Sequence, residues 1–181
     1  MINCNNDLII STLELEHSTN CLGYSFYFKR KAKFDIEKAI INEIPKMFWS
    51  RLQRNEIVFD QGKTYLPDMV LGKERKGLKL SFITDTRPNP SIATFIKESD
   101  LFICEGTYGD DNHLEKAIKN KHMTFREAAE LALKGEVKEL LLTHFSPVML
   151  NPEEFKDRAE DIFKNTIIGV DRLVKTLSFR E

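Results

Sequence analysis

The sequence predicts an α/β fold, and three observations support this prediction. The chain has 181 residues, of which 41% are hydrophobic, enough for one globular domain with a buried core. From residue 79 onward, apolar strand-like runs alternate with helix-like segments, which is typical of a sheet that helices bury on at least one face. No internal repeat or low-complexity tract interrupts this pattern. We therefore treat residues 1–181 as a single domain.

Two strand-like segments open the chain. Residues 7–18 and 21–31 are rich in β-branched and aromatic side chains, and His17 lies where the first segment ends. A basic cluster closes the second segment; it consists of Lys29, Arg30, Lys31 and Lys33. These segments predict a hairpin-like unit with a positively charged end.

Residues 34–79 are predicted to form an insertion that is only partly ordered, because short strand-like pieces alternate there with Gly and Pro turns. One short helix is expected at its start, ended by Pro45. The spacing of four apolar residues predicts one shared helix face, made by Ile36, Ala39, Ile40 and Ile44.

The remainder of the chain alternates strands with helices. A helix is expected directly after Thr124, because Thr124 and Glu127 have the spacing of a capping box. Gly135 lies where the end of that helix favours a positive φ. Three buried strands are expected in this half, at residues 80–84, 101–104 and 140–143.

Composition excludes several classes of protein. Charged residues make up 30% of the chain, but the formal net charge is only −1, so no global basic field indicates a nucleic-acid partner, although local patches could bind one. The three cysteines are scattered without a CxxC pair, which argues against a disulfide framework or a thiolate zinc site. No apolar stretch approaches the roughly 18 residues of a membrane span, and the N-terminus lacks a secretory signal pattern. We expect a cytoplasmic protein without a membrane partner.

Polar residues collect at the ends of the predicted strands. Asp85, Glu105 and His144 each end one of the three buried strands, and such ends meet at the ligand-binding edge of an α/β sheet. His17 ends the first strand, and His122 precedes the capped helix. Histidine and aspartate together suit zinc, since a carboxylate can bridge two ions. Four of these residues also have a simpler interpretation. Asp85 could be a turn former or helix cap, and Glu105 could pair with a lysine. His17 could be a surface strand residue, and His144 a capping or core histidine.

Five short segments together carry a resemblance to a known family. They are "LEHSTNCLGYSF", "TDTRP", "CEGTY", "HMTFREAAELA" and "LLLTHFSP", in this order. The chain resembles the C-terminal half of ribonuclease Z, a zinc-dependent endoribonuclease that removes the 3′ trailer of precursor tRNA. The resemblance implies a metallo-β-lactamase-like αββα sandwich, of which this chain would supply one mixed sheet with its flanking helices.

The resemblance also implies roles for the residues at the strand ends. Asp85 matches the aspartate that bridges two zinc ions, while His17 and His144 match one histidine ligand of each ion. Glu105 and His122 match a catalytic pair in which the carboxylate orients the histidine and the histidine assists the leaving oxygen.

The insertion at residues 34–79 occupies the place of the family's protruding arm, which grips the tRNA. The basic cluster at residues 29–33 and the segment "KERKGLK" are candidate phosphate contacts, with a solvated charged surface as the alternative. Arg87 is either a phosphate contact or, as we favour, a salt-bridge partner of a neighbouring acid. The arm lacks the Gly-Pro that is usual in the family.

One family signature is absent from this sequence. It is His-x-His-x-Asp-His, which supplies most of the zinc ligands, and no HxH occurs here. We therefore expect the chain to be inactive alone and to act with a complementing N-terminal half or as a homodimer. The expected inner sheet face, including parts of residues 80–83 and 140–142, would lack its usual cover. One alternative is a non-catalytic RNA-binding or dimerisation module of the same origin. Another is a related metallo-hydrolase that acts on a different ester, but the arm-like insertion argues against this one.

Overall fold

The computed structural model describes residues 2–5 and 7–179. The chain forms two compact units, which we describe separately. The first unit combines Met1–Phe28 with Gly77–Glu181, and the second unit is Lys29–Lys76. No helix in the described part of the chain is long and apolar enough to cross a bilayer.

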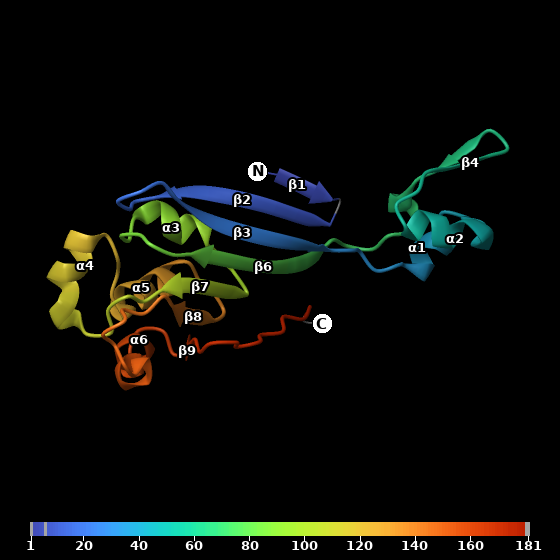
Figure 1. The fold of residues 1–181 in the computed structure, drawn as a ribbon. Helices are drawn as coiled ribbons and strands as arrows, with labels where there is room; N and C mark the ends of the chain where they lie inside the picture. The colour runs from blue at the N-terminus through green and yellow to red at the C-terminus, as the bar shows by residue number, and fades with distance from the viewer. Residues whose placement is uncertain (1, 6, 180–181) are drawn as a thin grey trace. The chain divides into compact units, whose positions relative to one another are not determined.

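A seven-stranded mixed sheet organises the fold (Figure 1). Its strand order is β1-β2-β3-β6-β7-β8-β9, in which β1, β2 and β3 pair antiparallel and β6 to β9 pair parallel. The α/β class and the mixed sheet predicted from the sequence are thereby confirmed. The strands are β1 (Ile2–Asn5), β2 (Leu8–Leu15), β3 (Cys21–Arg30), β6 (Arg75–Ile83), β7 (Leu101–Glu105), β8 (Leu140–Thr143) and β9 (Thr166–Ile168).

Helices pack on one face of this sheet and form its main core. Phe102 and Leu142, from β7 and β8, pack in one buried cluster with Phe125 and Ala128 of α5. Because side chains alternate along a strand, the same cluster takes only every second residue of β7 and β8. The helical segments of the first unit are α3 (Pro90–Phe95), η2 (Asp111–His113), α4 (Leu114–Asn120), α5 (Phe125–Lys134), η3 (Pro152–Phe155) and α6 (Lys156–Glu160).

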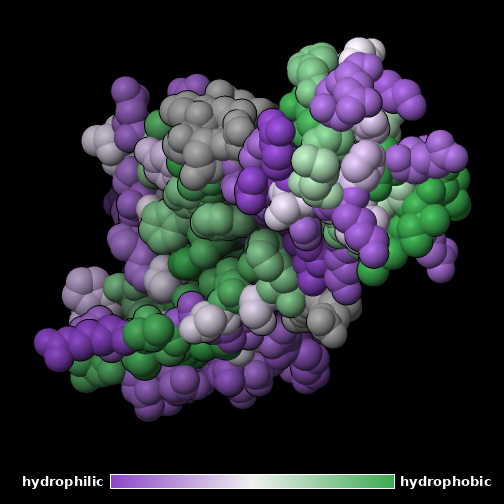
Figure 2. Space-filling view, turned by 90° about the vertical axis from the view of Figure 1, so that its right-hand side faces the viewer, coloured by the Kyte–Doolittle hydropathy of each residue, from purple (hydrophilic) through white to green (hydrophobic). Residues whose placement is uncertain are grey.

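Apolar side chains on the opposite face of the sheet reach solvent. Leu22, Tyr24, Phe28 and Phe82 are 36 to 45% exposed, and hydrophobic residues, coloured green, are visible at the surface in Figure 2. The sequence predicted that one face of this sheet, including parts of residues 80–83 and 140–142, would lack its usual cover. This prediction holds for Phe82. It is wrong for residues 140–142, which are at most 7% exposed. Part of the reason is that the chain after β9 packs against Leu141, whose Cδ1 lies 3.6 Å from where a Cβ of Gly169 would be.

Helix α5 begins as predicted but ends differently. Thr124 and Glu127 form the full capping box. Gly135, however, has φ −79°, and the positive φ falls one residue later, at Glu136 (φ 51°). Gly135 is needed for space instead, because a Cβ there would lie 2.6 Å from Cγ1 of Ile96.

The second unit has regular elements and a core of its own. The predicted helix is present as α1 (Ile36–Ile41), and Ala39 and Ile44 are buried as expected. The rest of the predicted apolar face is wrong, because Ile36 and Ile40 are 58 and 63% exposed. The other elements are α2 (Lys46–Gln53), β4 (Val58–Asp60), β5 (Lys63–Tyr65) and η1 (Pro67–Met69), and the core also takes in Phe48, Leu52, Val58 and Val70. That the second unit is an arm-like insertion within a single domain stays a prediction.

Candidate active site

Three parallel strands deliver polar residues to one edge of the sheet. Asp85 lies two residues after β6, Glu105 is the last residue of β7, and His144 directly follows β8. Since β6, β7 and β8 are neighbours and run parallel, their carboxyl ends lie side by side. The structure therefore brings together these three residues as the sequence predicted.

The backbone is unusual at two of these positions. Asp85 has φ 47° and His144 has φ 56°, both in the left-handed region that residues with a Cβ rarely adopt. Each such conformation costs on the order of 1–3 kcal/mol and persists only where the surrounding structure enforces it. Left-handed backbone after both β6 and β8, the strands on either side of β7, is typical of a functional site.

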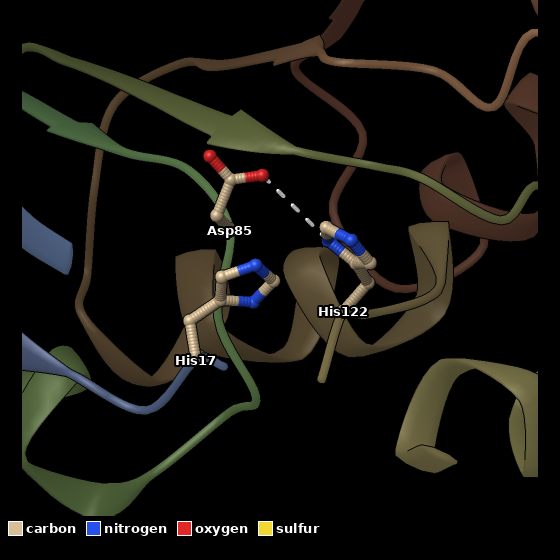
Figure 3. Close-up of side chains that lie close together, drawn as sticks. All are labelled: His17, Asp85 and His122. Atoms are coloured by element: carbon tan, nitrogen blue, oxygen red, sulfur yellow. Dashed lines mark ion pairs between the residues drawn. The ribbon is translucent and has the colours of Figure 1, made fainter. Parts of the chain in front are cut away.

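The side chains from separate segments converge on Asp85. Its Oδ1 lies 3.1 Å from Nε2 of His144 and 3.9 Å from Nδ1 of His122. The ring of His122 lies between two other imidazoles, with centroid distances of 5.0 Å to His17 and 5.4 Å to His144. Figure 3 shows Asp85, His17 and His122 directed toward one another.

Glu105 is fully buried and is held by four donors. Its carboxylate accepts hydrogen bonds from the backbone N–H of Thr86 (2.6 Å) and of Met123 (3.2 Å) and from the hydroxyl of Thr107 (2.6 Å). The fourth partner is Nδ1 of His122, 3.1 Å from Oε2. A buried carboxylate is stable only with such donors. The predicted Glu105–His122 pair is thus in contact.

The donor set fits a divalent metal ion such as zinc. The potential ligands form two groups, and within each group the ligand atoms lie within 4.8 Å of one another. The first group is His17, Asp85 and His122, and the second group is Glu105, His122 and His144. His17 donates its Nδ1 proton to the carbonyl of Lys121 (3.2 Å), which leaves Nε2 free. Ligating histidines in metal sites usually make such a second bond.

Cys21 approaches the same region without joining either group. Its Sγ donates to the carbonyl of Thr84 at 3.4 Å. Burial, reinforced by the nearby Asp85 carboxylate, raises the pKa of the Cys21 thiol. The thiol is therefore protonated at neutral pH in this structure.

Arg87 makes a salt bridge with an acid. Its guanidinium binds both carboxylate oxygens of Glu127 and donates to the carbonyl of His122, and both charged side chains are less than one fifth exposed. This pairing matches the salt-bridge role that the sequence favours for Arg87 over phosphate binding. Arg87 thereby links the segment that carries Asp85 to the start of α5 and to the loop that carries His122. A contact from Arg87 to RNA would require the pair to open.

Sequence reasoning missed Thr107, whose hydroxyl contacts both Glu105 and His144. The signal was present, because Thr107 is a polar residue two positions past the end of a buried strand. The predicted RNA-contact cluster lies in the second unit; it comprises Lys29, Arg30, Lys31 and Lys33.

Comparison with solved structures defines the class of the fold. Human tRNase Z, short form, superposes on 97% of this chain and 45% of its own, with a TM-score of 0.57 at 18% identity. A metallo-β-lactamase fold protein from Bacillus subtilis gives a TM-score of 0.55 at 16% identity, covering 90% of this chain and 47% of its own. The chain therefore has the metallo-β-lactamase fold, in the part that these alignments cover.

Comparison of sequences shows to which proteins with this fold the chain is related. Ribonuclease Z of Clostridium beijerinckii is 62% identical over 99% of this chain, and ribonuclease Z of Clostridioides difficile is 58% identical over 97%. The chain is thus a relative of ribonuclease Z along almost all of its own length, as the sequence motifs predicted. It spans 58% and 57% of the length of these two relatives. No family model matches the chain.

Proposed function

We propose that this chain provides part of a cytoplasmic, zinc-dependent endoribonuclease that removes the 3′ trailer of precursor tRNA. One observation carries the proposal: Asp85, His17, His122 and His144 converge at the strand ends of a chain that is 62% identical to a ribonuclease Z. In this proposal, activity requires further metal ligands besides those of this chain, and the chain is inactive without them. The missing ligands would come from a segment bearing His-x-His-x-Asp-His.

The proposed metal ligands are Asp85, His17 and His144. Asp85 suits a bridging role, because its carboxylate lies 3.1 Å from Nε2 of His144 and within 4.8 Å of a ring nitrogen of His17. His17 and His144 would each serve one ion through Nε2. When bound, the two zinc ions would supply Lewis acidity for the attacking and leaving oxygens of the phosphodiester.

His122 is the proposed proton donor to the leaving oxygen. The carboxylate of Glu105, buried and 3.1 Å away, orients the imidazole through Nδ1. The other ring nitrogen, Nε2, is then the atom available to the substrate. General acids positioned in this way contribute typically about 10²–10⁴-fold to the rate.

The second unit is the proposed RNA-gripping arm. Residues 29–76 contain 12 Lys and Arg against 7 Asp and Glu, a net charge of +5, whereas the rest of the chain carries 15 against 21, a net charge of −6. A basic unit on an acidic body is suited to contact RNA phosphates. Its proposed contacts are Lys29, Arg30, Lys31 and Lys33.

The test is reconstitution. The chain is purified with and without a polypeptide that carries the His-x-His-x-Asp-His segment of a close relative, and zinc per chain is measured by elemental mass spectrometry. We expect near zero zinc for the chain alone and about two ions with precursor-tRNA cleavage in the complemented protein. Asp85→Ala in the complemented protein is the inactive control. Zinc binding without cleavage of precursor tRNA would contradict the proposal.

A second candidate function is a non-catalytic module that binds RNA or dimerises. The exposed apolar face at Leu22, Tyr24, Phe28 and Phe82 favours it, because such a surface associates with a partner. RNA binding without cleavage in every combination, together with self-association in sedimentation experiments, would support this module instead.

A further inference from the structure

The hydroxyl of Thr107 links two parts of the candidate active site. Thr107 follows β7 and is 7% exposed. Its Oγ1 lies 2.6 Å from Oε2 of Glu105, 3.2 Å from Nδ1 of His144 and 3.2 Å from the carbonyl oxygen of His144. One small side chain therefore contacts both the carboxylate that holds His122 and a proposed metal ligand.

Counting protons assigns the direction of these bonds. A threonine hydroxyl has one proton to donate and lone pairs to accept. The bond to Glu105 is the shortest of the three and has a carboxylate acceptor, so the Thr107 hydroxyl donates its one proton to Glu105. Oγ1 is then left to accept from His144, and Nδ1 of His144 must carry a proton.

The opposite nitrogen of His144 has a competing partner. Its Nε2 lies 3.1 Å from Oδ1 of Asp85, which would attract a proton to Nε2. Asp85 is about one third exposed, so water competes for its carboxylate, whereas the Thr107–Glu105 bond is buried. The buried bond therefore decides which nitrogen keeps its proton when the ring is neutral.

We propose that Thr107 is a positioning residue that keeps Nδ1 of His144 protonated and thereby reserves Nε2 for the metal ion. This inference rests on the proposed function, in which His144 is a ligand. His17 has the same arrangement, with the carbonyl of Lys121 as the acceptor for its Nδ1 proton. Thr107 thus does for His144 what a backbone carbonyl does for His17.

The test uses two substitutions with opposite predictions. Thr107→Val keeps the shape of the side chain and removes the hydroxyl, and Thr107→Ser retains the hydroxyl. Nitrogen-15 NMR of the metal-free chain at about pH 8, above the usual pKa of histidine, reports which nitrogen of His144 is protonated. The matched control is Thr166→Val, because Thr166 is also buried but donates to the carbonyl of Phe163.

We expect a protonated Nδ1 in the unmodified chain, in Thr107→Ser and in Thr166→Val, and a protonated Nε2 in Thr107→Val. In the complemented protein, Thr107→Val should weaken zinc binding about 10–100-fold, and Thr107→Ser should restore it. An unprotonated Nδ1 in the unmodified chain, or no change in Thr107→Val, would overturn the inference. Because the NMR result needs neither zinc nor RNA, it can fail while the proposed function stands.

Discussion

Asp85 lies beside the imidazoles of the candidate active site. Its carboxylate faces imidazoles from two other segments, and its own backbone is held at φ 47°. A residue kept in a costly conformation among potential ligands indicates a functional constraint. Two predictions follow from the roles of single residues at this site.

The first concerns the bridging carboxylate. Asp85→Ala should reduce the zinc content of the complemented protein from about two ions per chain to less than one, because a bridging ligand serves both ions. Elemental mass spectrometry after dialysis measures this content. Asp111→Ala is the matched control, since Asp111 is a surface acid that pairs with Arg126. Unchanged zinc in Asp85→Ala would exclude the bridging role.

The second separates acid catalysis from metal binding at His122. His122→Ala should slow precursor-tRNA cleavage about 10²–10⁴-fold while zinc content stays unchanged. The distinction matters because His122 belongs to both groups of potential ligands. If zinc is lost together with activity, His122 is a ligand and the proposed role as proton donor is wrong.

Among the elements, α5 shows how a helix positions the site. Its capping box at Thr124 fixes the first turn, and the same Glu127 that completes the box also pairs with Arg87. Arg87 lies two residues after Asp85, and Thr124 two residues after His122. The first turn of α5 therefore holds two segments of the site in place, the one that carries Asp85 and the one that carries His122.

The end of α5 gives a prediction that differs from the usual expectation that a glycine adopts the positive φ at a helix end. Gly135→Ala should destabilise the chain by about 1–3 kcal/mol, because the new Cβ meets Ile96. Glu136→Gly should stabilise it by about 0.5–1 kcal/mol, because relief of the left-handed backbone outweighs the added freedom of the unfolded chain. Urea unfolding measures both changes. The reverse order of stabilities would place the left-handed residue at Gly135, as the sequence pattern predicted.

In the whole molecule, charge is divided unequally between the two units. The second unit carries +5 and the rest of the chain −6. Phosphate contacts release counterions, so binding that depends on the second unit must weaken steeply with salt.

We predict that replacing Lys29, Arg30, Lys31 and Lys33 by alanine weakens precursor-tRNA binding at least about tenfold and reduces the salt slope of log K by about 3 to 4. Fluorescence anisotropy at several salt concentrations measures both quantities. The matched control removes three lysines and one arginine from the first unit, namely Lys116, Lys119, Lys164 and Arg158. An equal loss in both variants would mean that net charge, and not the second unit, governs binding.

The sequence by itself determined the main elements after residue 79 and the candidate ligands. The alternation of apolar strands with helices, the capping box at Thr124 and the polar residues after strands 80–84, 101–104 and 140–143 were all readable. These features depend on neighbours along the chain, so local pattern is sufficient to predict them. The family motifs, which the comparison with ribonuclease Z confirmed, are likewise short segments of sequence.

Only the tertiary structure decided which groups meet. The contact of Thr107 with His144, the pairing of Arg87 with Glu127, and the close approach of Ile96 to Gly135 join residues that are far apart in the sequence. So does the cover over residues 140–142. No local pattern encodes such contacts, because they depend on how the strands are ordered in the sheet and how the helices pack on it.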